Sequence, residues 1–176
     1  MARYRNGDPI PQVTDPTQWS NLTTGAWCWY NNDSATYAFT YGRLYNWYAV
    51  NDPRGLAPQG WHVPTDGEWN KLIKFIDLTA DTTQCCSNVA GIAMKSTTGW
   101  YNSGNGTNSS GFSGLPGGFR NFVGTYGAFG DGGSWWSVSN FNTINAWDRA
   151  LGYDFSSINR NYNNKALGFS VRVVKD

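Results

Sequence analysis

The sequence predicts a single, loop-rich α+β domain that spans residues 1–176. Its length fits one domain with a buried core. Gly residues number 21 and aromatic residues make up 16%, whereas charged residues make up 14%, well below the usual ~25%. Only two segments carry clear helix signals, and the other apolar segments are short, aromatic-rich and separated by Gly, Asn, Pro and Ser. We therefore expect aromatic packing and turns, with few charged helices, to stabilise the fold.

Both expected helices begin with a capping signal. Asp15 is a good N-cap and precedes Pro16, which favours a short helix that contains Trp19. Residues 65–68 (TDGE) form a capping box, and apolar residues follow it at helical spacing: Trp69, Leu72, Ile73 and Ile76. This pattern predicts an amphipathic helix, with Trp69 and the aromatic residue of the preceding GWHVP segment in the main core.

The strand-like segments are short. Aromatic and β-branched residues gather at 27–30, 41–50, 135–138 and 169–174, each bounded by turn residues. Residues 97–113 show almost no periodicity and are expected to form a long structured loop. No internal repeat and no linker divides the chain.

Charge and hydropathy exclude two classes of partner. Thirteen basic and twelve acidic residues give a formal charge of +1, so nucleic acid is not an expected ligand. No apolar run approaches the ~20 residues that span a bilayer, which argues against direct membrane insertion. The chain also opens on polar sequence at Met1, without the apolar core of a signal peptide.

The cysteines and the one histidine give no zinc pattern. Cys85 and Cys86 are adjacent and cannot bridge each other readily, so a bridge from Cys28 to one of them and three unbridged thiols are both open. No CxxC occurs, and His62 is the only histidine, which we expect to be packed in its turn. We expect no metal site, no cofactor and no catalytic residue.

Several motifs resemble one bacterial family. Residues 60–69 (GWHVPTDGEW) resemble the GW-x-[VL]-P-T-x-x-E-W signature of formylglycine-generating-enzyme-like domains and of the bacterial major paralogous domain of the FISUMP type. Further similar blocks lie at 28–33, 41–47, 111–120 and 168–174. The resemblance implies a C-type lectin-like fold, in which two helices lie beside a small, twisted antiparallel sheet and long loops carry a binding surface.

Residues 135–174 also resemble the variable region of proteins that are diversified by retroelements. In such systems an error-prone reverse transcriptase randomises adenines in chosen codons, which in AAC or AAT codons never yields Lys, Glu, Gln or Met. Residues 137–164 contain no Lys, Glu, Gln or Met. The composition of the rest of the chain predicts only about two such residues in a segment of this length, so their absence is weak support. The resemblance implies a diversified binding face on a rigid scaffold.

The alternation of side chains predicts which residues form that face. Two sets alternate with a period of two and therefore point to opposite sides of an extended segment: Trp147, Arg149 and Leu151, and Asp148, Ala150 and Gly152. We assign the first set to the scaffold, with Ile158, Arg160 and Lys165 as further fixed points. Arg149 and Arg160 are expected to tie loops down through backbone carbonyls.

The predicted ligand-binding residues are polar or aromatic, like those of an antibody paratope, and are expected to be accessible and to share one face. They are Asn140, Phe141, Asn142, Thr143, Asn145, Asp148, Tyr153, Asp154, Phe155, Ser157, Asn159, Asn161, Tyr162 and Asn163. The residues expected beneath them are Trp147, Leu151, Ile158, Phe169 and Val171. The alternative is that these are ordinary Asn-rich turns of a loop-heavy domain.

These patterns predict a non-catalytic protein at the cell surface or on a phage particle, whose partner is a protein or glycan such as a cell-surface receptor. The alternative is a non-diversified envelope module that binds glycan or has a structural role. Formylglycine-generating enzymes use two cysteines near the C-terminal part of the domain, and this chain has none after Cys86. Calcium-dependent sugar binding is also not expected, because Arg149 follows Trp147 and Asp148 where a third oxygen ligand is needed.

Overall fold

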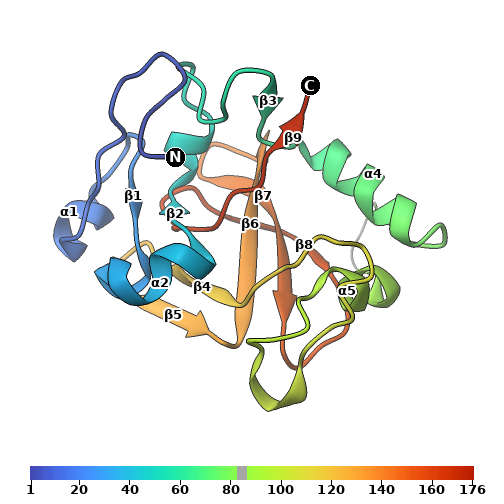
Figure 1. Cartoon of the computed structure of the whole chain (residues 1–176). Coiled ribbons are helices and arrows are strands. Elements are labelled where there is room, and N and C mark those ends of the chain that lie inside the picture. Colours follow the sequence, from blue (N-terminus) through green and yellow to red (C-terminus); the bar gives the residue numbers. More distant parts are fainter. Residues whose placement is uncertain (83–86) are drawn as a thin grey trace.

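The computed structural model describes residues 1–82 and 87–176 (Figure 1). The helices are α1 (Pro16–Ser20), α2 (Ser34–Tyr41), α3 (Trp47–Val50), α4 (Asp66–Ile76) and α5 (Asn88–Met94), with 3-10 turns at Tyr30–Asn32 and Tyr101–Ser103. The strands are β1 (Trp27–Cys28), β2 (Leu44–Tyr45), β3 (Trp61–His62), β4 (Gly117–Arg120), β5 (Tyr126–Phe129), β6 (Gly132–Asn140), β7 (Asn145–Gly152), β8 (Asn159–Asn164) and β9 (Val174–Lys175).

The α+β class is confirmed, and so are both predicted helices. Asp15 caps α1 by accepting a hydrogen bond from the amide of Gln18. Thr65 and Glu68 form the reciprocal capping box at the start of α4. The expectation of only two helices was wrong, because α2, α3 and α5 are also present. These helices are short, and their caps are Asp, Asn and Ser residues that equally favour turns in a sequence this rich in them.

A five-stranded sheet with the order β5-β4-β6-β7-β8 forms the centre of the fold. Strands β6, β7 and β8 form an antiparallel meander, and β4 meets β6 in parallel at Gly118 and Gly133. Two-stranded ladders join β1 to β2 and β3 to β9. Residues 97–113 contain one 3-10 turn and no strand or α-helix, so the predicted long loop is confirmed.

Two adjacent tryptophans show how the sheet divides the core. Trp135 packs in a cluster with Trp69 of α4, whereas Trp136 packs in another with Trp47 of α3. Neighbouring residues of a strand point to opposite faces, so α4 and α5 cover one face and the N-terminal elements cover the other. Figure 1 shows the central strands between these two layers. Both faces of β6 and β7 are therefore covered along most of their length.

The GWHVP segment contributes to the core only in part. Trp69 is 2% exposed, as predicted, and Val63 is buried. Trp61 is 39% exposed, so the expectation that it packs in the core was wrong. Its two-residue strand, β3, pairs with β9 at the periphery, where no second layer covers the indole. His62 is half-buried, and its two ring nitrogens lie 2.6 Å from Asp176 Oδ1 and 2.9 Å from Glu68 Oε1.

The thiol of Cys28 is free and buried on β1. Of the two alternatives for this residue, the structure therefore shows the unbridged one, and Cys85 and Cys86 lie outside the described residues. Burial raises the pKa of the Cys28 thiol, which disfavours the reactive thiolate. Within residues 1–82 and 87–176, no helix has the length and apolar character needed to cross a bilayer.

Candidate functional site

Three aromatic side chains meet at the end of the β6–β7–β8 meander, a surface that we call the aromatic tip. Phe141 stacks on Tyr162 with ring centroids 4.0 Å apart and planes 13° apart. Trp147 meets both rings edge-on, at 4.9 Å and 5.8 Å. Trp147 and Tyr162 are register partners on β7 and β8, which places them on the same face. Phe141 is 41% exposed and Tyr162 is 52% exposed, so the tip presents aromatic surface to solvent.

The turn that carries Phe141 has a fixed backbone although its side chains are exposed. The amides of Phe141 and Asn142 both donate to the carbonyl oxygen of Asn145. Buried Lys165 reaches the turn from beneath, and its Nζ donates to the carbonyls of Asn142 at 2.8 Å and Thr143 at 3.1 Å. Burial lowers the pKa of this ammonium. A charged donor on two otherwise solvent-facing carbonyls holds the turn in one conformation.

Two arginines connect the aromatic tip to the start of α4. The guanidinium of Arg160 lies 3.5 Å from the ring centroid of Trp147 and donates to Asp66 Oδ1 at 3.0 Å and Oδ2 at 2.9 Å. Arg149, fully buried on β7, is 2.9 Å from Asp66 Oδ1 and also donates to Asn70 Oδ1 at 2.5 Å. Asp66 is the first residue of α4. The capping box thus positions the carboxylate that holds both arginines.

Asp66 is ionised in this setting. Burial favours the neutral acid, but hydrogen bonds from Arg160 and the charge of Arg149 outweigh it and hold the pKa of Asp66 below its usual value. Burial lowers the pKa of Arg149, and the Asp66 carboxylate opposes that effect. One carboxylate therefore pairs with two guanidinium groups directly beneath the aromatic tip.

The other face of the same strands carries a carboxylate, that of Asp148, which has no arginine partner among the described residues. Asp148 is fully buried on β7, where its Oδ1 accepts a hydrogen bond of 2.8 Å from Asn163 and its Oδ2 has no partner. Burial raises the pKa of Asp148 to about 7. The prediction that this residue faces solvent was wrong. The period of two was right, but the side of β7 that carries Asp148 packs against the N-terminal elements and does not face solvent.

The predicted binding residues do not share one face. Thirteen of the fourteen are exposed or half-buried, Asp148 being the exception. They form three groups: Asn140, Phe141, Asn142, Thr143, Asn145 and Tyr162 at or beside the tip; Asn159, Asn161 and Asn163 on the Asp148 side of β8; and Tyr153, Asp154, Phe155 and Ser157 in the loop between β7 and β8. Antiparallel strands place successive connections at opposite ends. The last group therefore lies roughly 20 to 25 Å from the tip, the length of β7.

The loop at residues 153–157 packs against α5. Lys95 Nζ donates to the carbonyls of Gly152 at 3.0 Å and Phe155 at 2.9 Å. A Cβ at Gly91 of α5 would lie 2.1 Å from the carbonyl oxygen of Ser156, so the loop and the helix touch through their backbones. This contact gives the loop a structural role.

The expected supports are placed largely as predicted. Leu151, Ile158 and Phe169 are buried, whereas Trp147 and Val171 are half-buried. Arg149 donates to the carbonyls of Asp66 and Asp148, as expected of it, whereas Arg160 donates to the carboxylate of Asp66. Reasoning from sequence missed Asp66 and Asn70, although acidic residues are favoured in the first turn after a capping box.

A shallow groove joins the aromatic tip to the asparagines of the edge strand. It has a volume of about 480 Å³ and is lined by Trp147, Arg160, Asn161, Tyr162 and Asn163. Strand β8 is the last strand of the sheet, so this groove borders an unpaired edge. Within the described part of the chain, no three His, Cys, Asp or Glu side chains come together as a possible metal site.

The fold and the site define a small, loop-rich α+β domain with an aromatic surface on a buried polar frame. The chain belongs to the family described as the Fibrobacter succinogenes major domain, whose family model matches residues 1–175. This confirms the resemblance to the FISUMP-type major paralogous domain, over the whole chain. Comparisons with curated proteins and with solved structures gave no match. The lectin-like fold stays a prediction.

Proposed function

We propose that this chain is a non-catalytic binding module that contacts a macromolecular ligand through the aromatic tip and the adjoining groove. The observation that carries the proposal is the separation of roles at the tip. Exposed Phe141 and Tyr162 present ring surface, while Asp66, Arg149 and Lys165 hold the backbone and the rings from below. Rigid aromatic side chains bind at low cost in conformational entropy.

Within residues 1–82 and 87–176, the settings of the cysteine and the histidine support a non-catalytic role. Cys28 is buried and its pKa is raised, so its reactive form is disfavoured. Both ring nitrogens of His62 are engaged by carboxylates. Such a histidine has neither nitrogen directed at a substrate.

We further propose that the gene is diversified at the accessible positions, as in retroelement-diversified proteins, and that the protein is displayed on a cell or phage surface. The structure supports a smaller variable surface than the sequence suggested. Asn140, Phe141, Thr143, Asn161 and Tyr162 are accessible at the tip or in the groove, whereas Asp148 and its hydrogen-bond partner Asn163 belong to the frame. Substitutions at accessible sites usually change stability by only about 0.5 kcal/mol, so a fixed frame tolerates their variation.

Glycan binding by a non-diversified envelope module is the second candidate. It is favoured by the lining of the groove, where the rings of Trp147 and Tyr162 lie beside the amides of Asn161 and Asn163. Aromatic faces with a few placed polar groups are typical of small-ligand sites. A diversified protein requires a near-copy of the last part of the gene and a reverse transcriptase nearby, so sequencing the flanking DNA separates the two candidates.

The binding role is tested with purified protein on a panel of immobilised glycans and on intact bacterial cells. We expect Tyr162→Ala to lower binding by about tenfold or more, since loss of a central aromatic contact costs over 1 kcal/mol. Phe75→Ala is the matched control, because Phe75 is 86% exposed on α4 and does not belong to the tip. Equal binding by both variants and the parent would refute the assignment. Glycan binding that is lost in Tyr162→Ala supports the second candidate.

A further inference from the structure

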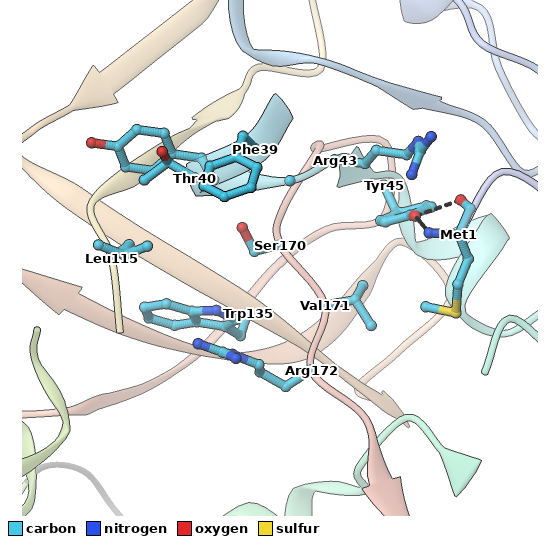
Figure 2. A pocket seen from close by; sticks show the side chains of 13 residues that line it. Met1, Phe39, Thr40, Arg43, Tyr45, Leu115, Trp135, Ser170, Val171 and Arg172 are labelled. Atoms are coloured by element: carbon cyan, nitrogen blue, oxygen red, sulfur yellow. Dashed lines mark hydrogen bonds between the residues drawn. The ribbon is translucent and has the colours of Figure 1, made fainter. Parts of the chain in front are cut away.

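A second cavity, separate from the aromatic tip, lies between α2–β2 and residues 170–172. Its volume is about 330 Å³, within the range of small-ligand sites, and none of its lining residues belongs to the tip. Figure 2 shows Phe39, Thr40 and Arg43 above the side chain of Ser170, and Trp135 and Arg172 below it. The cavity therefore has one basic residue on each of two opposite walls.

The charge of this cavity is positive and uncompensated within the described residues. Its lining contains Arg43 and Arg172 and no Asp or Glu. The ion pairs found in residues 1–82 and 87–176 belong to other basic residues, so no carboxylate lies within 4.0 Å of either guanidinium. Arg43 packs over the rings of Trp27 at 4.4 Å and Trp29 at 4.5 Å, and its buried Nε has no hydrogen-bond partner.

Arg172 carries its charge at the exposed rim of the cavity. Its Nη2 donates to the carbonyls of Phe112 at 2.9 Å and Ser113 at 3.2 Å, and its guanidinium lies 4.9 Å from the Phe112 ring centroid. The two carbonyls and the ring orient the Arg172 cation but do not neutralise its charge. An anionic ligand would therefore supply the charged partner that Arg172 lacks within the described part of the protein.

The remaining lining suits a polyol. Ser170 and Thr40 bring hydroxyl groups to the lining, and the backbone of Ser170 is fixed by hydrogen bonds to the carbonyl of Ser134 and from the amide of Trp136. The ring of Phe39 is fully exposed and forms part of the wall above Ser170, whereas the indole of Trp135 is buried (Figure 2). Hydroxyl groups and an aromatic ring are complementary to the polar edge and the C–H face of a sugar.

From this arrangement we infer that the cavity binds an acidic saccharide, a sugar ring that carries a carboxylate or sulfate. The guanidinium groups of Arg43 and Arg172 attract the anion. The planar N–H donors of an arginine fit the oxygens of a carboxylate or sulfate better than the ammonium group of a lysine does. Ser170 and Thr40 hydrogen-bond to ring hydroxyls, and the exposed ring of Phe39 packs on the sugar. This inference does not depend on the proposed function of the aromatic tip.

Titration calorimetry at low salt tests the inference with four probes: glucuronate, galacturonate, glucose and inorganic sulfate. We expect at least one uronate to bind, to bind more tightly than glucose or sulfate, and to weaken as salt is added. Arg172→Met should weaken uronate binding by roughly 10- to 100-fold, the effect of losing one charged hydrogen bond. Ser170→Leu should abolish binding by filling the cavity.

Arg54→Met is the matched control, because Arg54 pairs with Asp8 and Asp52 and does not line this cavity. Tyr162→Ala is a second control, and both should bind the uronate like the parent. Each variant is first checked for the parent's circular dichroism spectrum, and Arg43→Met replaces Arg172→Met or Ser170→Leu if either fails to fold. No binding of either uronate up to about 50 mM would overturn the inference. Equal binding of glucose or of sulfate, or equal weakening in Arg54→Met, would overturn it as well.

Discussion

Asp66 and Asp148 lie on opposite sides of β7, and their carboxylates differ in hydrogen-bond partners and in pKa. Asp66 is bound by Arg149 and Arg160, and its pKa is lowered. Asp148 is fully buried, has one unpartnered oxygen, and has a pKa raised to about 7. The Asp66 side is a satisfied network that supports the exposed tip. On the other side, Asp148 is a buried acid with an unpaired oxygen, which lowers the stability of the folded state.

The largest expected effect is on the Asp66 side. Asp66→Ala removes the carboxylate and leaves Arg149 as a buried charge without its ion-pair partner, which should cost about 3 to 5 kcal/mol of unfolding free energy. Urea denaturation of the variant measures this loss. Asp154→Ala is the control, because Asp154 is exposed in the loop after β7 and should change stability by less than about 0.5 kcal/mol. Similar stability of both variants would contradict the role of Asp66.

The Asp148 side should respond to pH. The pKa of Asp148 is about 7 in the folded state, whereas in the unfolded chain it is 3.8, the ordinary value of an aspartic acid. Between these values the folded state binds more protons, so this group's contribution to stability falls as pH rises from about 4 to 7. Asp148→Asn keeps the shape and removes the titration.

Relative to the parent, Asp148→Asn should therefore gain about 2 to 4 kcal/mol of unfolding free energy on going from pH 4 to pH 8. Denaturation of both proteins across this range measures the difference in unfolding free energy at each pH. The contributions of the other titrating groups are common to both proteins and cancel in this difference. Asp131→Asn, at an exposed site, is the control and should show no such gain. A parent and Asp148→Asn with parallel pH curves would show that Asp148 is solvated.

A smaller effect is expected where the frame meets the exposed turn. Lys165→Met keeps the length of the side chain and removes two charged hydrogen bonds, to Asn142 and Thr143, at a cost of roughly 1 to 3 kcal/mol. Amide hydrogen exchange should speed up at residues 141–145 before it does in the rest of the sheet. Lys175→Met, at an exposed position of β9, is the control. Unchanged exchange in this turn would mean that the turn does not depend on Lys165.

The same two carboxylates show which features of the fold can be predicted from the sequence and which cannot. The capping box at 65–68 predicts the start of α4, and with it the location of Asp66. The alternation along 147–152 correctly separates the two sides of β7. Which side is exposed depends on what packs on each, and this is set by elements far away in sequence, such as α3 and α4.

The candidate site was predicted in part for the same reason. The residues of the turn at 141–144 and Tyr162 are accessible as expected. Residues 153–157 are adjacent to them in sequence but lie at the other end of the strands, because each turn of a meander reverses the chain. Local pattern identifies segments that carry polar and aromatic residues. Their assembly into one surface depends on strand pairing, which no local pattern contains.

The central claim is that the frame fixes the tip and leaves its accessible side chains free to change. The most direct measurement is the thermal unfolding of a library randomised at Asn140, Phe141, Thr143, Asn161 and Tyr162, with the residues of the frame, Asp66, Arg149 and Lys165, kept. Most members should fold, with melting temperatures within a few degrees of the parent, because each exposed substitution changes stability by only about 0.5 kcal/mol. A library in which most members are unfolded would contradict the claim.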